Sequence, residues 1–282
     1  MESQLVLSEA DLAKSDVLYA PKTSSRRVLR IRGSNIAVKK GPNLDLVEGE
    51  TLKFIRRRTT IPVPRVFNTY MQGGIGYILM DYVEGQKLAD VWPKLAKEKR
   101  DIILSELREY IRQLRRLKRT EEVEQEGQKE NQNGRGNFME TKIASVTGGP
   151  VVDRRVMGIV MGGPFASEQA FNAWQLDQLD TDIAARHRDM YAAMHKEDHE
   201  IVFSHGDLGF HNILVDDNHI TAIIDWEDAG WFPEHWDYCK SSGYFSGNND
   251  LYLAQKQIYE KQYFAEYLMD MWFTREVKHG GF

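Results

Sequence analysis

Two aspartates and one asparagine in the second half of the chain have the types and the spacing of a catalytic site that uses a cation. Asp207 stands five residues before Asn212, and Asp225 follows Asn212 by thirteen residues. One carboxylate, on Asp207, would orient or deprotonate a nucleophile. The Asn212 amide and the Asp225 carboxylate offer hard oxygen ligands of the kind that Mg²⁺ takes. The alternative is that these residues only end turns and strands, as Asp and Asn commonly do.

The elements around the three residues would bring them together. Two short β-rich runs, 213–215 and 220–224, flank a polar turn at 216–219, which predicts a hairpin. Asn212 stands at the start of the outward strand and Asp225 at the end of the returning strand. The hairpin would therefore place them side by side, and the tight loop before it would present Asp207 next to them.

The segment from Ser204 to Val215, followed by Asp225-Trp226-Glu227, resembles the catalytic loop and the metal-binding aspartate of the protein-kinase-like superfamily. It is most similar to the aminoglycoside phosphotransferase and choline kinase branch, where His-Gly-Asp-Leu-x-x-x-Asn-Ile-Leu-Val is the usual form. The resemblance covers about residues 28–250. Further segments resemble fungal members of the phosphotransferase enzyme family; they are 147–150, 163–165, 171–172 and 233–240.

This resemblance implies an α+β, two-lobed protein-kinase-like fold with a small antiparallel β-sheet in the N-terminal lobe and a larger, mainly helical C-terminal lobe. The residue patterns agree, since β-rich runs at 28–32, 36–40 and 77–82 accompany a short amphipathic helix at 46–58. We place a nucleotide-binding lobe at 1–84 and a catalytic and substrate-binding lobe at 85–282. The polar stretch 118–137 predicts a mobile surface loop that proteases would cut first.

The resemblance also assigns residues to the nucleotide. Lys39, on a predicted strand, would hold the α- and β-phosphates of ATP, and a carboxylate on the following helix would orient it. The apolar face of that helix favours Glu48, with Glu50 as the alternative. The backbone carbonyl of Asp81 and the amide of Val83 would bind the adenine edge.

Aromatic and acidic residues follow the metal-binding aspartate, a combination that can hold a cationic substrate. For the aromatic residues the alternative is ordinary packing in the core of the helical lobe. The residues that we select as candidate substrate contacts are Glu227, Trp231, Glu234 and Trp236.

The resemblance implies an enzyme that uses ATP and Mg²⁺ to move the γ-phosphoryl group to a hydroxyl of an aminoglycoside-, choline- or metabolite-like small molecule. A protein kinase is a weaker alternative, because Asp225 is followed by Trp-Glu rather than Phe-Gly and no Ala-Pro-Glu appears downstream. A non-catalytic pseudokinase or ligand-binding scaffold is the other alternative. It is favoured by the absence of a Gly-x-Gly-x-x-Gly lid and by the short interval between Lys39 and Glu48.

Composition excludes several other classes. The chain has 282 residues, of which 41% are hydrophobic, and a net charge of −5, which disfavours non-specific nucleic-acid binding. Its single cysteine cannot form an internal disulfide, and no apolar run is long enough to span a bilayer. Because no signal-peptide pattern opens the chain, we expect a cytoplasmic enzyme without nucleic-acid or membrane partners.

Overall fold

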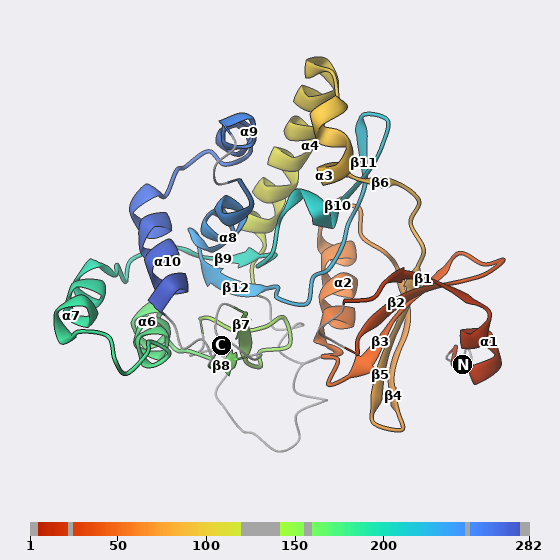
Figure 1. The fold of residues 1–282 in the computed structure, drawn as a ribbon, viewed down its shortest axis with the longest axis horizontal. Coiled ribbons are helices and arrows are strands. Elements are labelled where there is room, and N and C mark those ends of the chain that lie inside the picture. Colours follow the sequence, from red (N-terminus) through yellow and green to blue (C-terminus); the bar gives the residue numbers. More distant parts are fainter. Residues whose placement is uncertain (1–4, 22–24, 120–141, 155–159, 246–248, 277–282) are drawn as a thin grey trace. The chain divides into compact units, whose positions relative to one another are not determined.

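The computed structural model describes residues 5–21, 25–119, 142–154, 160–245 and 249–276 (Figure 1). The chain divides into two compact units, the first formed by Met1–Ile103 with Phe210–Glu227 and the second by Leu104–Gly209 with Asp228–Phe282. The lobe boundary predicted at residues 84–85 falls inside the first unit. The loop predicted at 118–137 lies outside the described residues from position 120 onward.

A five-stranded antiparallel sheet dominates the first unit and confirms the predicted β-rich runs. The strand order is β1-β2-β3-β5-β4, and every neighbouring pair is antiparallel. Two of the strands, β1 and β4, were not predicted from the sequence. The strands are β1 (Ser15–Tyr19), β2 (Arg27–Ile31), β3 (Ile36–Pro42), β4 (Val66–Gln72) and β5 (Ile75–Asp81).

The alternation of side chains along β3 gives the sheet two different faces. Val38 is fully buried in a hydrophobic cluster with Leu29, Tyr77 and Leu79. Lys39, the next residue, points to the opposite face, where helix α2 (Val47–Arg58) packs. The amphipathic helix predicted at 46–58 is therefore confirmed, and its buried side chains close the second face of the sheet.

The rest of the first unit is built around a three-stranded sheet, β11-β10-β6. The hairpin predicted at 213–224 supplies its strands β10 and β11, with Ile213 opposite Ile223. The backbone N–H of Ile223 also donates to the carbonyl of Pro62, which ties the hairpin to the segment before β4. The elements are α1 (Glu9–Ala13), β6 (Gln86–Lys87), α3 (Leu88–Val91), the 3₁₀ helices at Trp92–Lys94 and Phe210–Asn212, β10 (Ile213–Asp216) and β11 (His219–Ile223).

The second unit is mainly helical, as predicted for the C-terminal part of the chain. Helix α4 (Lys97–Arg116) begins in the first unit and continues here. Ser167 caps α6 by accepting a hydrogen bond from the Ala170 N–H. The other elements are β7 (Val151–Asp153), β8 (Val160–Gly162), α6 (Glu168–Asp177), α7 (Ala185–Met194), β9 (Ile201–Ser204), β12 (Gly230–Pro233), α8 (Trp236–Phe245), α9 (Asn249–Ile258) and α10 (Phe264–Glu276).

Two hydrophobic clusters hold the second unit together. In one cluster, Phe171 of α6 packs with Phe232 of β12 and Trp236 of α8. In the other, Tyr191 of α7 packs with Phe273 of α10, and Figure 1 shows α6, α7 and α10 gathered on the same side of this unit. The fold as a whole is the α+β fold that the sequence predicts.

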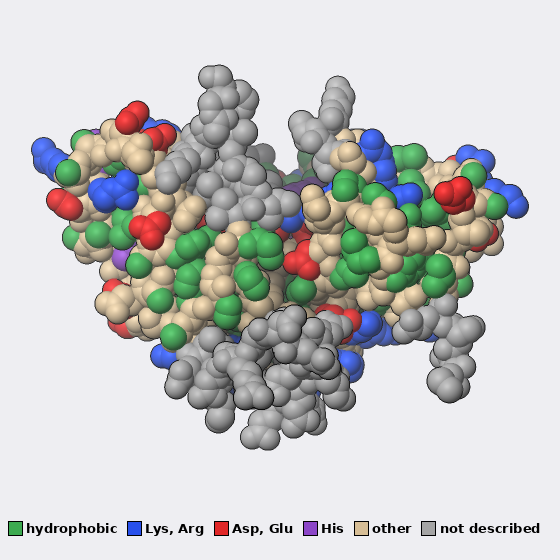
Figure 2. Space-filling view, turned by 90° about the horizontal axis from the view of Figure 1, so that it is seen from below, with side chains coloured by type: hydrophobic (Ala, Val, Ile, Leu, Met, Phe, Trp, Pro, Cys, Tyr) green, Lys and Arg blue, Asp and Glu red, His purple; other side chains and the backbone are tan. Residues whose placement is uncertain are grey.

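The surface is mixed in character. Figure 2 shows hydrophobic, basic and acidic side chains interspersed over the described part of one face. Within the described residues, no helix is both long enough and apolar enough to cross a membrane.

The packing of α2 on the sheet generates a prediction. A Cβ atom added at Gly49 would lie 2.4 Å from Cγ2 of Thr69 on β4, a distance that real Cβ atoms essentially never show. We therefore expect Gly49→Ala to lower the free energy of unfolding by about 1–3 kcal/mol, the usual cost of overpacking. Urea unfolding monitored by circular dichroism measures this change.

The matched control removes the methyl group that the added Cβ atom would meet. Thr69→Ser deletes the Cγ2 methyl group, so Gly49→Ala in this background should be neutral or stabilising, because alanine favours a helix by about 1 kcal/mol over glycine. Equal destabilisation by Gly49→Ala in both backgrounds would contradict the described contact between α2 and β4.

Candidate active site

A buried lysine surrounded by carboxylates is the centre of the candidate site in the first unit. Lys39 on β3 has a side chain that is only 9% exposed. Its Nζ lies 2.7 Å from Oε2 of Glu48, 2.6 Å from Oδ1 of Asp225 and 3.3 Å from Oε2 of Glu227. The carboxylates come from α2 and from the residues that follow the β10–β11 hairpin. Helix, sheet and hairpin therefore converge on a single ammonium group.

The charges in this cluster depend on one another. Burial alone would lower the pKa of Lys39, but Glu48, Asp225 and Glu227 together raise it above its usual value. Burial raises the pKa of Glu48, and the neighbouring Lys39 ammonium opposes that rise. The pKa of Glu48 stays raised overall, so the ion pair favours the charged form of both partners but does not fully offset the burial of the carboxyl group.

The structure pairs Lys39 with the glutamate that the sequence favoured. Glu48 is buried against Lys39, whereas Glu50, the alternative, pairs with Lys53 at 2.6 Å one turn further along the helix. Lys40 points to the other face of the sheet, with its Nζ 5.2 Å from the centre of the Tyr77 ring.

The hairpin brings the predicted metal-binding residues to the same end of two paired strands. Asn212 is buried and directly precedes β10, and its carbonyl accepts a 2.9 Å hydrogen bond from the N–H of Ile224. Asp225 follows Ile224 with a φ of 64°, a left-handed conformation that is uncommon outside glycine. The indole N–H of Trp226 donates to the carbonyl of Ile223, and its buried ring anchors this turn.

Glu227, predicted as a substrate contact, lies among the charged side chains around Lys39. Its carboxylate accepts a 2.8 Å hydrogen bond from the guanidinium of Arg26 and lies beside Lys39. Arg26 also donates to the carbonyl of Asn43 after β3. Sequence reasoning missed Arg26 as a partner, because nothing local relates it to a residue 201 positions away.

The loop that carries Asp207 belongs to the second unit and is held by buried polar groups. The backbone N–H of Asp207 donates to Nδ1 of the fully buried His205. The carboxylate of Asp237 on α8 accepts hydrogen bonds from the N–H groups of His205 and Gly206 at 3.0 and 2.8 Å. Burial raises the pKa of Asp237, against the effect of these bonds.

Gly206 is required in this loop for two reasons. Its φ is +84°, and a Cβ atom there would lie 2.3 Å from the backbone oxygen of Asp228. The side chain of Asp207, by contrast, is partly exposed. Sequence reasoning missed Asp237 as a support of the loop. The buried-type residues beside it, Trp236, Tyr238 and Cys239, are the signal that it is an interior acid.

The other three candidate substrate residues are engaged within the second unit. Trp231 and Trp236 are each 3% exposed, and the Trp236 ring stacks on Phe232 with centroids 4.7 Å apart. The carboxylate of Glu234 accepts hydrogen bonds from Lys261 at 2.5 Å and from the Tyr263 hydroxyl at 2.8 Å. Trp231 and Trp236 therefore pack in the core, which was the alternative interpretation of the aromatic residues.

The predicted adenine-binding residues lie where β5 ends. Asp81 is the last residue of β5, and its carboxylate accepts a hydrogen bond from the N–H of Arg65. Val83 follows in an irregular, partly exposed segment that leads to β6.

Comparison with solved structures shows which known proteins share this fold. The fold is similar to solved structures of aminoglycoside phosphotransferases. Aminoglycoside phosphotransferase APH(4)-Ia has a TM-score of 0.54 at 14% identity, over 93% of this chain and 90% of that chain. The streptomycin–ATP–APH(2″)-IIa ternary complex has a TM-score of 0.57 at 11% identity, over 96% and 86%. At these identities the similarity defines the fold, which is the predicted kinase-like one.

The sequence itself identifies the family. A model of the phosphotransferase enzyme family matches residues 46–272, most of the chain. The protein therefore belongs to the phosphotransferase enzyme family, as its catalytic-loop motif predicted. A search of curated proteins gave no match.

The coupling between Lys39 and Glu48 generates a prediction about stability and pH. Lys39→Met leaves Glu48 buried near two other carboxylates, and removing one partner of a buried pair typically costs about 3–5 kcal/mol. The folded-state pKa of Glu48 then rises further above its unfolded value. A carboxyl shifted in this direction stabilises the fold at low pH and loses that contribution as the pH rises. We therefore expect the loss from Lys39→Met to be larger at pH 8 than at pH 5.

Two control variants define the result. Lys40→Met removes the same charge from the opposite face and should give a small, pH-independent change. Adding Glu48→Gln to Lys39→Met should abolish most of the extra loss at pH 8. Denaturant unfolding at both pH values measures these differences, and equal losses for Lys39→Met at pH 5 and pH 8 would contradict the described coupling.

Proposed function

We propose that this protein is a kinase that uses ATP and Mg²⁺ to transfer the γ-phosphoryl group to a hydroxyl of a small molecule. The observation that carries the proposal is the buried Lys39, held by Glu48 and adjoining Asp225 at the end of the hairpin. Membership in the phosphotransferase enzyme family supports it. A lysine and carboxylates in this arrangement match the parts that kinase-like enzymes use to hold nucleotide phosphates.

The first unit supplies the groups that would bind MgATP. Lys39 would neutralise charge on the α- and β-phosphates, while Glu48 keeps the ammonium charged and in place. The Asn212 amide and the Asp225 carboxylate are hard oxygen donors, which fits Mg²⁺. When bound, this cation would neutralise charge that develops on the phosphates. The Asp81 carbonyl and the Val83 amide remain our candidates for the adenine edge.

Asp207 is our candidate for the catalytic base. In the proposed step its carboxylate takes the proton of the acceptor hydroxyl, the hydroxyl oxygen forms a bond to the γ-phosphorus, and the bond to the leaving ADP oxygen breaks. His205 and Asp237 would contribute by fixing the loop backbone, so that the carboxylate is positioned before the substrate arrives.

The acceptor is a small molecule in this proposal, of the aminoglycoside-, choline- or metabolite-like kind. A related solved structure, a thermostable mutant of APH(4)-Ia, is a ternary complex with ADP and hygromycin B, at 14% identity and with a TM-score of 0.52 over 93% of this chain and 91% of that chain. The resemblance to fungal members of the family stays a prediction and does not narrow the acceptor class.

The proposal predicts that Asp207→Asn separates turnover from binding. Asparagine keeps the size of the side chain but cannot accept a proton as a carboxylate does, so phosphoryl transfer should fall by about 10²–10⁴-fold. The affinity for MgATP should stay within about threefold of wild type, because Asp207 is not among the residues proposed to hold the nucleotide. The assay screens pools of hydroxyl compounds with γ-labelled ATP and measures MgATP affinity by calorimetry on the same preparations.

Asp216→Asn is the matched control, since this exposed aspartate lies at the far end of β10. It should retain full turnover. Retained turnover in Asp207→Asn would remove Asp207 from the mechanism. A loss of MgATP affinity in the same variant would instead place it among the nucleotide or metal contacts.

A further inference from the structure

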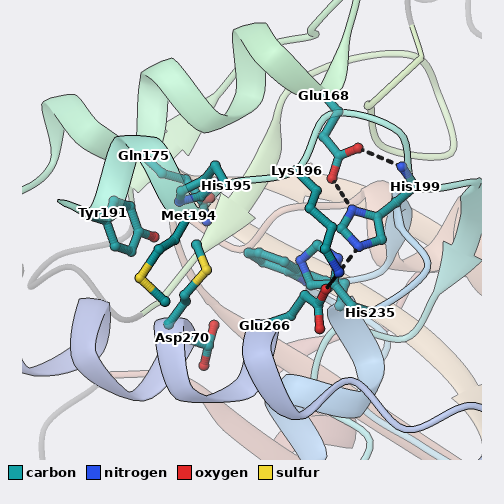
Figure 3. Close-up of a pocket in the computed structure, with 12 residues that line it drawn as sticks. Glu168, Gln175, Tyr191, Met194, His195, Lys196, His199, His235, Glu266 and Asp270 are labelled. Atoms are coloured by element: carbon teal, nitrogen blue, oxygen red, sulfur yellow. Dashed lines mark hydrogen bonds and ion pairs between the residues drawn. The ribbon is translucent and has the colours of Figure 1, made fainter. Parts of the chain in front are cut away.

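A second cluster of titratable side chains lies in the second unit, and none of its members has a role in the proposed phosphoryl transfer (Figure 3). Glu168 is the first residue of α6, His199 lies between α7 and β9, and His235 directly precedes α8. One potential ligand atom from each residue lies within 4.8 Å of the other two. Three segments that are distant in sequence therefore present a carboxylate and two imidazoles to the same point.

Glu168 fixes the position of His199. Its Oε1 lies 2.7 Å from Nδ1 of His199, and its Oε2 accepts the backbone N–H of His199 at 3.0 Å, as Figure 3 shows. The two side chains are 3% and 5% exposed. This buried pair holds one imidazole in a defined orientation, which is a condition for a preorganised ligand set.

His235 is the part of the cluster that hydrogen bonding does not explain. Its Nδ1 is buried and has no hydrogen-bond partner among the residues that the structure describes, although buried polar atoms normally have one. Its ring lies 4.5 Å from the His199 ring, at an angle of 59°.

The cluster borders a cavity of about 30 Å³, enough for an ion or a water molecule. Glu266 of α10 also lines the cavity, with Oε1 3.4 Å from Nε2 of His199 and 2.5 Å from Nζ of Lys196. A neighbouring hollow of about 250 Å³ shares Lys196, His199 and Glu266 with this cavity.

We propose that Glu168, His199 and His235 form a binding site for a divalent transition metal of the zinc type. Two imidazoles and one carboxylate are a ligand set that suits Zn²⁺, with a fourth position left for water or for Glu266. Mg²⁺ and Ca²⁺ prefer oxygen ligands and would be disfavoured by the two nitrogens. A purely structural network accounts for the pairing of Glu168 with His199, but it leaves Nδ1 of His235 without a role.

The test uses the full chain after treatment with a chelator. Titration with Zn²⁺, followed by calorimetry and by metal analysis after desalting, should give one ion per chain, and Co²⁺ should give the visible absorption of a tetrahedral site. His235→Phe keeps an aromatic ring but has no lone pair. It should weaken Zn²⁺ binding by at least about 10-fold, since even groups that only support metal ligands are worth about 10–100-fold.

Controls separate this site from other sources of binding. His187→Phe changes an exposed histidine of α7 and should bind Zn²⁺ like wild type. Asp225→Asn should also retain the Zn²⁺, because the proposed nucleotide site is in the other unit. His235→Phe breaks no hydrogen bond at Nδ1, so its fold should persist, and circular dichroism checks this directly.

The Zn²⁺ titrations of wild type and the two histidine variants decide whether the metal site exists. One Zn²⁺ per wild-type chain, lost selectively in His235→Phe, supports the site. Failure of wild type to retain Zn²⁺, or equal binding by His235→Phe and His187→Phe, overturns it and leaves the cluster as a hydrogen-bond network alone.

Discussion

The ion pairs of the buried Lys39 ammonium are the interactions on which the first unit depends. A charged lysine that is 9% exposed needs opposite charges within a few ångströms, and the chain provides them from α2 and from the end of the hairpin. The sheet must present Lys39 on the face that α2 covers, and the helix must begin so that Glu48 points inward. The turn after β11 must then aim Asp225 at the same ammonium, in a left-handed backbone conformation that is uncommon for residues other than glycine.

In the second unit, hydrogen bonds to a buried carboxylate stabilise the loop that carries Asp207. The loop before Asp207 turns sharply at Gly206, and its N–H groups would be unsatisfied without the buried Asp237 carboxylate. Side chains that hold the backbone, His205 and Asp237, are buried, whereas the carboxylate proposed to act on substrate is partly exposed. The supporting groups are thus shielded from solvent, and Asp207 remains accessible for chemistry.

Local pattern was sufficient for the features with short-range causes. The hairpin could be predicted from two β-rich runs around a polar turn, and Glu48 from the apolar face of its own helix. Contacts between distant segments could not be predicted, since no sequence periodicity links Arg26 to Glu227 or Asp237 to His205. Residue type also misled for Trp231 and Trp236, because an aromatic ring suits a binding surface and a core equally well, and only the packing around it decides.

The central claim is that the Lys39 cluster binds the phosphates of a nucleotide. Calorimetry of MgATP binding to wild type, Lys39→Met and Lys40→Met tests it most directly, because the two variants remove the same charge from opposite faces of one strand. The account predicts one MgATP per chain for wild type and Lys40→Met, and at least about 10-fold weaker binding for Lys39→Met, the equivalent of about 1.4 kcal/mol. Equal affinities for all three proteins, or no binding by folded wild type, would contradict it.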